Sequence, residues 1–303
     1  MKIFDCFQFF DENMMLDLRM NILNKYVDYF VIVENLYMHN GKKKGQNFNI
    51  ENFSKFKDKI KYVLIEKLPE DLEQVDEKKR GQDSENSKII NNALKIEKKQ
   101  RNGIQEGLKE SEENDLIFFG DVDEIPNFEN FKYKSKITVF KQKMLYYKLN
   151  LVYPNFVWMG TKVCKKKHLL SAEWLRSVKS KKYPWWRIDN LFSDKKYTNI
   201  GFVENGGWHF TNIKSPTDLD FKMRSFAHHL EYEESGMTLN ELKNNMKNKV
   251  VFYDHNIDKS NSKKHQANIK LEKISLKDLP SYISVNSKKY SDWIDWSINL
   301  IVK

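Results

Sequence analysis

The apolar positions in the first third of the chain predict short strands that alternate with helices. Apolar runs at 2–9, 29–34 and 60–65 have the length and composition of strands. Between these runs, apolar residues recur at helical spacing in a helix that Asp11 can cap and in a short helix after Asn49. Such alternation is typical of a parallel sheet with crossover helices, so the predicted fold class is α/β.

The most informative apolar run is 116–119, which has no polar break and is followed by Gly120. A run of this kind is typical of a strand buried on both faces. Asp121, Asp123 and Glu124 follow at its carboxyl end. Three acids so close together repel one another unless a positive group lies between them, and a divalent cation carrying a phosphate would meet this need. The alternative interpretation is a solvated turn whose acids face water.

The predicted sheet has one edge where a ligand is expected. Ligands of open α/β sheets bind outside the carboxyl ends of the strands, so Glu34 and Asp121 are expected together on that edge. The charged segment 66–88 contains few large apolar residues and is expected to form a flexible insertion or lid. A helix that carries Arg101 is expected over 89–108.

The second half of the chain is rich in aromatic residues. Residues 136–158 predict β structure, whose aromatic side chains suit sugar rings but serve more commonly as core. Residues 204–222 combine two glycines, which allow close backbone approach, with His209 and lysines, as a metal-and-phosphate corner would. A helix is expected around 226–231, and a polar segment follows at 256–268.

Composition adds a net charge of +10, from 52 Lys and Arg against 42 Asp and Glu in 303 residues. This balance favours anionic partners such as nucleotides, nucleic acid, acidic glycans or membrane surfaces, although lysine is frequent throughout the chain. Cys6 and Cys164 form neither a disulfide framework nor a metal-thiolate spacing, which fits a reducing cytosol. No signal peptide, membrane-spanning stretch or internal repeat is visible, so a soluble, at most peripheral, cytoplasmic protein is expected.

Seven short motifs occur along the chain in a specific order, from about Phe4 to Tyr282. They are DCFQFFDE, VDYFVIVEN, QRNGI, DVDEIP, GGWHF, KMRSFAH and LPSYI. Each motif is weak alone, but the ordered set resembles glycosyltransferase family 17, the β-1,4-mannosyl-glycoprotein β-1,4-N-acetylglucosaminyltransferases. The resemblance implies a nucleotide-diphospho-sugar transferase fold of the GT-A type, with a mixed central sheet flanked by helices.

The same resemblance implies an inverting enzyme that uses a UDP-sugar, with N-acetylglucosamine (GlcNAc) as the sugar, and Mn²⁺ or Mg²⁺. One catalytic domain would span residues 1–303. Residues 1–126 would form its nucleotide-binding half, 127–255 its acceptor and metal-completing half, and 256–303 a tail that packs back. Golgi members of the family carry an amino-terminal membrane anchor, which is not seen in this sequence.

The metal site that the resemblance implies consists of Asp121, Asp123 and His209. Asp123 would be the direct metal ligand and Asp121 would lie nearer the ribose. His209 belongs to the Gly-Trp-His element and also resembles the late metal-binding histidine of glycogenin-like transferases. Lys222 matches a family lysine that could neutralise the diphosphate, and Lys214 is its rival.

Other family positions concern the nucleotide. Glu34, Gly41 and Lys44 match the loop expected near the base. Arg101 stands in the QRN element, and its planar guanidinium suits phosphate or a carboxylate partner.

An inverting transferase also needs a carboxylate that takes the acceptor's proton. Glu204, just before the glycines, is the first choice, and Asp189 and Glu231 are the alternatives. The stretch FAHHLE leaves open whether His228 or His229 takes the family's histidine position.

Two other functions compete with the transferase. A basic, aromatic-rich protein could bind nucleic acid, but the acid cluster would repel phosphates without a cation, so no nucleic-acid partner is expected. A catalytically silent relative could bind sugars as a lectin does. The acceptor, the donor sugar and the oligomeric state are not set by the sequence.

Overall fold

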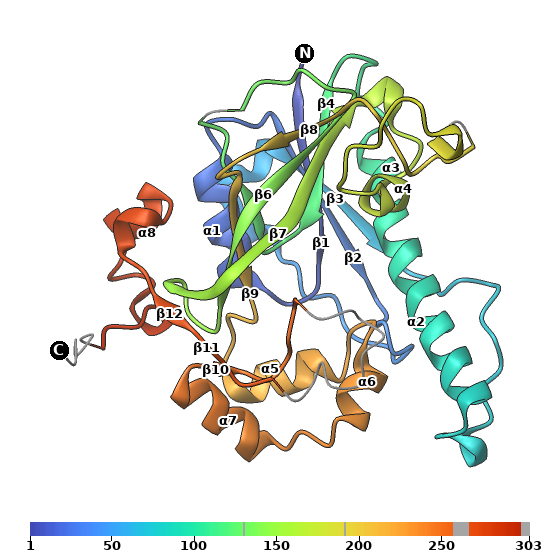
Figure 1. Cartoon of the computed structure of the whole chain (residues 1–303), viewed down its shortest axis with the longest axis vertical. Coiled ribbons are helices and arrows are strands. Elements are labelled where there is room, and N and C mark those ends of the chain that lie inside the picture. Colours follow the sequence, from blue (N-terminus) through green and yellow to red (C-terminus); the bar gives the residue numbers. More distant parts are fainter. Residues whose placement is uncertain (130, 191, 257–266, 298–303) are drawn as a thin grey trace. The chain divides into compact units, whose positions relative to one another are not determined.

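The computed structural model describes residues 1–129, 131–190, 192–256 and 267–297 (Figure 1). The chain divides into two compact units, and each is described by itself. The first unit comprises residues 1–142, 159–207 and 225–227. The second unit comprises 143–158, 208–224 and the chain from 228 onward. The expected halves with boundaries at 126 and 255 stay a prediction, and most of the polar segment 256–268 lies outside the described residues.

The first unit is built on parallel strands (Figure 1). β1 (Ile3–Phe9) lies between β2 (Tyr29–Asn35) and β4 (Leu116–Asp121), and β3 (Ile60–Ile65) borders β2. β7 (Leu151–Lys165) runs antiparallel to β4, which makes the sheet mixed. The predicted α/β class, with a mixed sheet flanked by helices, is confirmed.

The sheet continues with strands that follow β4 in the chain. β6 (Ile137–Tyr146) pairs in parallel with β8 (Ile200–Val203), and β5 (Glu124–Pro126) is a short strand directly after the acidic turn. β6 and β7 both continue from the first unit into the second.

Helices cover both faces of the parallel strands. The helices of the first unit are α1 (Asn13–Leu23), α2 (Asp83–Asn102), α3 (Ile104–Gly107) and α4 (Ala172–Ser177), with the 3₁₀ helix η1 (Ile50–Lys59). On one face Val33 of β2 packs in a cluster with Ile104 of α3. On the other face Phe30 of β2 contacts Phe56 of η1, with ring centroids 6.2 Å apart. Burial on both faces explains the unbroken apolar run at 116–119 in β4, as expected.

Several helix boundaries differ from the prediction. The helix expected over 89–108 is interrupted at Gly103, and the helix expected around 226–231 begins only at His229. α1 has Glu12 rather than Asp11 at its N-cap position. α2 begins at Asp83, inside the segment that was expected to be a lid. The rest of that segment lies along α2, because Lys99 donates to the carbonyl of Leu68 (2.9 Å) and Asn92 donates to the carbonyl of Glu73 (2.8 Å).

The second unit is smaller and has a tyrosine-rich core. The last residues of β6 pair with β9 (Gly207–Thr211), and Tyr146, Tyr147 and Tyr153 are buried beside Leu219. The aromatic stretch therefore contributes core, which was the more common of its two expected uses. The helices of this unit are α5 (Pro216–Met223), α6 (His229–Glu234), α7 (Leu239–Asn248) and α8 (Ser281–Val285). Its short strands are β10 (Val250–Val251), β11 (Ile269–Lys270) and β12 (Glu272–Lys273).

Short 3₁₀ turns complete the described elements. They are η2 (Glu77–Lys79), η3 (Lys166–His168), η4 (Ile188–Asn190), η6 (Leu276–Asp278) and η7 (Ser291–Trp293). Cys6 and Cys164 are buried free thiols, as the sequence predicts. Within the described ranges, no helix has both the length and the apolar character that a bilayer crossing requires.

Candidate active site

Two acids lie near the carboxyl ends of β2 and β4, the two strands that flank β1. In the parallel register, Glu34 of β2 lies opposite Phe9, and Asp121 of β4 lies opposite Gln8. Both side chains therefore belong to the carboxyl edge of the parallel sheet. The predicted placement of Glu34 and Asp121 on one edge is confirmed.

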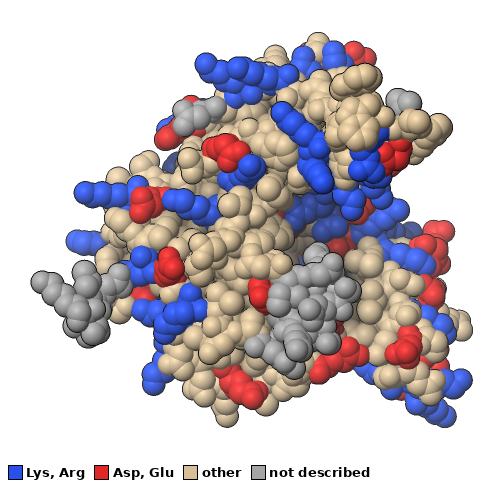
Figure 2. Space-filling view, viewed as in Figure 1, with Lys and Arg blue, Asp and Glu red and all other residues tan. Residues whose placement is uncertain are grey.

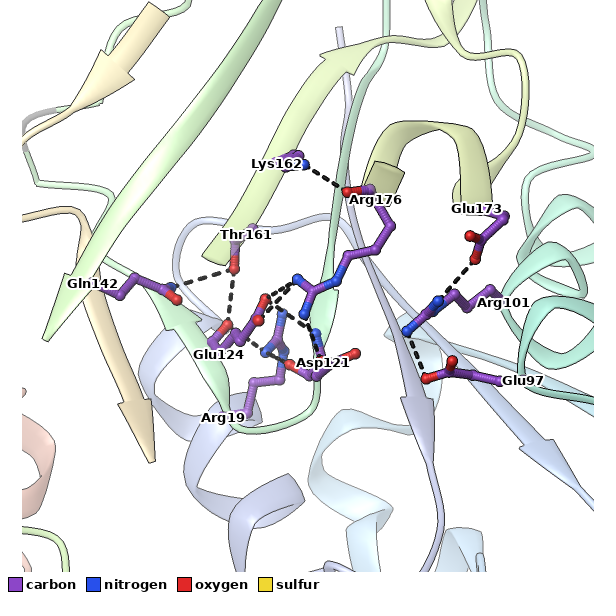
Figure 3. A network of polar contacts seen from close by, with 10 residues as sticks. All are labelled: Arg19, Glu97, Arg101, Asp121, Glu124, Gln142, Thr161, Lys162, Glu173 and Arg176. Carbon is purple, nitrogen blue, oxygen red and sulfur yellow. Dashed lines mark hydrogen bonds and ion pairs between the residues drawn. The ribbon is translucent and has the colours of Figure 1, made fainter. Parts of the chain in front are cut away.

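A guanidinium group lies between the acids of the turn after β4 (Figure 3). Arg176 of α4 donates to Oδ2 of Asp121 at 2.8 Å and to both carboxylate oxygens of Glu124 at 2.9 and 3.0 Å. Burial disfavours the charged guanidinium, but these two carboxylates outweigh it and raise the pKa of Arg176. The positive group that the acid cluster requires is thus supplied, at least in part, by the protein itself.

The backbone of the same turn is held by a second arginine. Arg19 of α1 is fully buried and forms a two-pronged ion pair with Asp5, at 2.7 and 2.8 Å. Its Nη1 also donates to the carbonyls of Asp121 (2.9 Å), Val122 (3.2 Å) and Glu124 (2.8 Å). One side chain therefore fixes the directions of three carbonyls in the turn that carries the carboxylates. Figure 3 shows Arg19 beside Asp121 and Glu124.

Two glycines permit the close packing around this turn. A Cβ on Gly120 would lie 2.8 Å from Oε2 of Glu124. Gly207 has φ +129°, and a Cβ there would lie only 2.2 Å from the carbonyl oxygen of Ile125. The GGWHF element therefore begins directly against the strand that follows the acidic turn. A Cβ on Gly206 would lie 2.7 Å from the carbonyl oxygen of Val203, so the close backbone approach predicted at Gly206 and Gly207 is confirmed.

The three expected metal ligands come from both units. Asp123 is buried within the acidic turn of the first unit. His209 lies on β9 in the second unit, where it is buried and its ring stacks on Trp158 with centroids 4.7 Å apart. Within the described ranges, no three His, Cys, Asp or Glu side chains gather as a metal site. The site formed by Asp121, Asp123 and His209 stays a prediction.

Glu34 holds the loop that follows it. Its carboxylate is fully buried and accepts four hydrogen bonds. The donors are Nζ of Lys44 (2.5 Å), the backbone N–H of Asn47 (2.7 Å) and Phe48 (3.0 Å), and the hydroxyl of Tyr62 (2.8 Å). Gly41 occupies a turn of the same loop with φ +85°. Glu34 and Lys44 therefore shape the loop, and any contact with a nucleotide base stays a prediction.

Arg101 of α2 lies between two carboxylates. Its Nη1 donates to Glu173 at 2.8 Å and its Nη2 donates to Glu97 at 2.6 Å. Burial disfavours the charge, but Glu97, Asp121 and Glu173 outweigh it and raise the pKa of Arg101. Its proximity to Asp121 extends the network of Figure 3 toward α2.

Two lysines expected at the diphosphate lie in the second unit. Lys214 follows β9, and Lys222 lies in the last turn of α5.

Asp189, one of the candidate bases, is paired with two cations. Hydrogen bonds from Arg187 and Lys196, at 2.6–2.9 Å, lower its pKa to about 2. A carboxylate of such low basicity accepts a proton poorly at neutral pH.

Each of the other two candidate bases also has a side-chain partner. Glu204 lies in the turn after β8, with 71% of its side chain exposed, and pairs with Lys141 at 2.5 Å. Glu231 of α6 accepts from Nδ1 of His228 at 3.1 Å, when that nitrogen carries the proton. His229, the other candidate for the family position, is buried at the start of α6.

The sequence analysis assigned no role to Arg176. It also assigned none to Lys162, whose side chain supports the helix end that carries Arg176. Lys162 of β7 is buried, and its Nζ donates to the carbonyls of Arg176 (2.6 Å) and Val178 (2.5 Å) at the end of α4. Burial and the nearby Arg176 charge lower the pKa of Lys162 to about 7. The only signal in the sequence was the requirement for a cation beside the acids, which does not say where the cation comes from.

A shallow surface pocket lies elsewhere, between β3 and the region of α3, and none of the predicted site residues lines it. The carboxyl edge of the sheet therefore remains the candidate site.

The chain is similar in structure to 2-C-methyl-D-erythritol 4-phosphate cytidylyltransferase of Francisella tularensis, with 12% identity, 73% of this chain and 98% of that chain covered, and a TM-score of 0.28. Among curated proteins no match is found. The model of glycosyltransferase family 17 matches residues 1–291. The chain therefore belongs to glycosyltransferase family 17, enzymes that join a sugar donor to an acceptor.

Proposed function

We propose that this glycosyltransferase moves GlcNAc from a UDP-sugar to a glycan hydroxyl, with Mn²⁺ or Mg²⁺ and with inversion of the anomeric centre. The meeting of two distant motifs carries the proposal. Gly207 of GGWHF packs against Ile125, directly after the turn that contains Asp121 and Asp123. Both motifs belong to the family, and the turn lies at the carboxyl edge of a parallel sheet, where ligands bind.

The oxygen donors of the turn fit a hard divalent cation. Such a cation is usually held by one or two carboxylates together with substrate phosphates and water, so a donor diphosphate completes the site without a third carboxylate. Arg176 donates to Oδ2 of Asp121, whose side chain keeps 35% of its surface exposed. Asp123 would be the direct ligand and Asp121 would lie nearer the ribose, while His209 as a further ligand rests on the family resemblance alone.

The bound cation would offset the negative charge that develops on the leaving UDP. The chain's own residues prepare the site for this step. Arg19 orients the carbonyls of the turn, and Arg176 pairs with the buried carboxylate of Glu124. Lys222, or its rival Lys214, would add positive charge near the diphosphate, as the family resemblance implies.

The acceptor hydroxyl must lose its proton as it attacks the sugar. Glu204 remains the first choice for this base, because Asp189 is held at a pKa of about 2 by its two cationic neighbours. Glu204 would have to exchange its exposed ion pair with Lys141 for the acceptor, which costs little because exposed pairs are worth at most about 1 kcal/mol. Glu231 stays the alternative.

A thermal-shift panel tests the donor and the metal together. The protein is heated with UDP-GlcNAc, a GDP-sugar, a CMP-sugar or an oligonucleotide, each with Mn²⁺ and with a chelator. The proposal predicts stabilisation by UDP-GlcNAc that requires Mn²⁺. Equal stabilisation with the chelator would remove the metal from the proposal, and stabilisation by the oligonucleotide alone would replace it with the nucleic-acid function.

A matched pair of variants tests the base. Glu204→Gln is expected to lower transfer by at least about 100-fold while UDP affinity is kept, because general-base catalysis contributes about 10²–10⁴-fold. Asp189→Asn is expected to retain transfer. Wild-type turnover in Glu204→Gln rules out Glu204.

A further inference from the structure

Four large apolar side chains of one loop are exposed to solvent. They are Trp185 (86% exposed), Trp186 (66%), Ile188 (71%) and Phe192 (86%). Single exposed apolar residues are normal on protein surfaces, but large contiguous ones mark a surface that another apolar phase covers. The described residues of this loop, 183–190 and 192–197, belong to the first unit and are called the aromatic loop below.

The base of the aromatic loop is held closed by backbone contacts. Lys182 and Tyr197 form a β-bridge, and the N–H of Tyr183 donates to the carbonyl of Tyr197 at 3.3 Å. Indole Nε1 of Trp174, on α4, donates to the carbonyl of Asp194 at 2.6 Å. A loop with its ends joined and anchored in this way is a defined surface feature rather than a loose connection.

Three charged side chains of the loop, Arg187, Asp189 and Lys196, contact one another. Asp189 accepts hydrogen bonds from Arg187 and Lys196, and both cations lie over the ring of Tyr183, at 5.7 and 5.6 Å from its centroid. These three charged groups are thus paired with one another, while the four large apolar side chains are exposed. A loop adapted to water alone would instead expose its charged side chains and bury its apolar ones.

The surroundings of the loop are positively charged. Residues 179–196 contain six Lys and Arg against two Asp, a net charge of +4. Figure 2 shows Lys and Arg side chains close to uncharged ones in the region where Figure 1 draws this segment in yellow. Tryptophan with Lys and Arg is the composition of segments that lie at the headgroup level of anionic membranes.

From these observations we propose that the aromatic loop docks the enzyme onto an anionic membrane surface. Its apolar side chains would enter the headgroup boundary and the neighbouring cations would contact lipid phosphates. A soluble glycan is the weaker fit, because Ile188 and Phe192 offer it no hydrogen bond and the Asp189 carboxylate is engaged by two cations. The proposal does not depend on the identity of the sugar donor.

Co-sedimentation of the full chain with vesicles tests the proposal. Vesicles of phosphatidylcholine mixed with phosphatidylglycerol are compared with phosphatidylcholine alone, at low and high salt. The expected result is sedimentation with the anionic vesicles, a blue shift of tryptophan fluorescence, and release by salt. Absence of sedimentation with anionic vesicles at low salt would overturn the proposal.

Loop variants locate the contact. The triple variant Trp185→Ser, Trp186→Ser, Phe192→Ser is expected to bind anionic vesicles at least about tenfold more weakly, since burial of one such side chain is worth about a factor of ten or more. Lys181→Glu with Lys182→Glu is expected to weaken binding to anionic vesicles as well. Val285→Ser, at an exposed apolar position of α8, is the control and should bind as the wild type does.

Two outcomes would contradict this location. Wild-type vesicle binding by the triple variant would place the contact elsewhere. Quenching of loop fluorescence by a soluble oligosaccharide, without any vesicle binding, would assign the loop to a glycan. The triple variant should unfold at the same temperature as the wild type and should be stabilised equally by UDP-GlcNAc. These controls show that its fold and donor site are intact, so the membrane test and the donor test can fail independently.

Discussion

Glu34 and Asp121 lie at the same edge of the sheet, but their carboxylates have different surroundings. Glu34, at the end of β2, is fully buried and accepts four hydrogen bonds that close a loop. Asp121, at the end of β4, keeps 35% of its side chain exposed and shares Arg176 with Glu124. The position of an acid at the carboxyl edge therefore does not decide its use. The number of protein donors that it already accepts separates an anchor from a candidate ligand.

Asp123→Ala removes the proposed metal ligand and should have the largest effect on turnover. Release of UDP from UDP-GlcNAc is expected to fall by at least about 1000-fold, because the loss of one group that stabilises the leaving charge costs about 10²–10³ in rate and the cation is lost with it. Turnover within tenfold of the wild type would mean that the turn is not the donor site.

Glu34→Leu should have the largest effect on stability. Removing one partner of a buried ion pair leaves Lys44 and three other donors without their acceptor, which is expected to lower the free energy of unfolding by about 3–5 kcal/mol. The matched change Asp121→Asn, at the more exposed acid, should cost less than about 1 kcal/mol. Urea denaturation measures both, and similar losses would erase the distinction between anchor and ligand.

Arg176→Met leaves Glu124 buried without its guanidinium partner. We expect a loss of about 2–4 kcal/mol in unfolding free energy, and a larger stabilisation by Mn²⁺ than in the wild type, since a cation would then take over the neutralising role. Thermal unfolding with and without Mn²⁺ measures this. An equal Mn²⁺ response in both proteins would show that Arg176 and the cation do not serve the same carboxylates.

Lys162 makes stability depend on pH. Its pKa is about 7 in the folded protein and 10.5 for a free lysine, so between these values the folded state holds fewer protons than the unfolded state. Lys162 therefore increases the free energy of unfolding as pH rises above 7, by at most about 1.4 kcal/mol per pH unit.

Urea denaturation at pH 7, 8 and 9 measures this dependence, with Lys162→Met as the comparison. The difference between the two proteins removes contributions that both share. The wild type should gain more stability than Lys162→Met as pH rises from 7 to 9. Parallel curves would mean that Lys162 is not buried as a neutral amine at high pH.

Much of the sheet could be predicted because its signals are local. β3 matches the predicted run 60–65, and the placement of Glu34 and Asp121 on one edge follows from parallel strands alone. Close approach at Gly207 could also be expected, because a glycine pair in a polar turn has few other uses.

The partners of the acidic turn could not be predicted, because they come from far along the chain. Arg176 lies 55 residues after Asp121, and Arg19 lies 102 residues before it. No short motif in the sequence connects either arginine to the turn. Three mutually close acids predict that positive charge is needed, but only the packing of α4 against β4 shows that an arginine provides it.

Calorimetric titration of UDP into the protein tests the central claim, that the acidic turn binds the donor through a cation. The account predicts binding in Mn²⁺ that falls by at least about 100-fold with a chelator, and by a similar factor in Asp123→Ala, because several kcal/mol of charge stabilisation are lost. Asp189→Asn should bind as the wild type does. Equal UDP affinity in all four titrations would contradict the account.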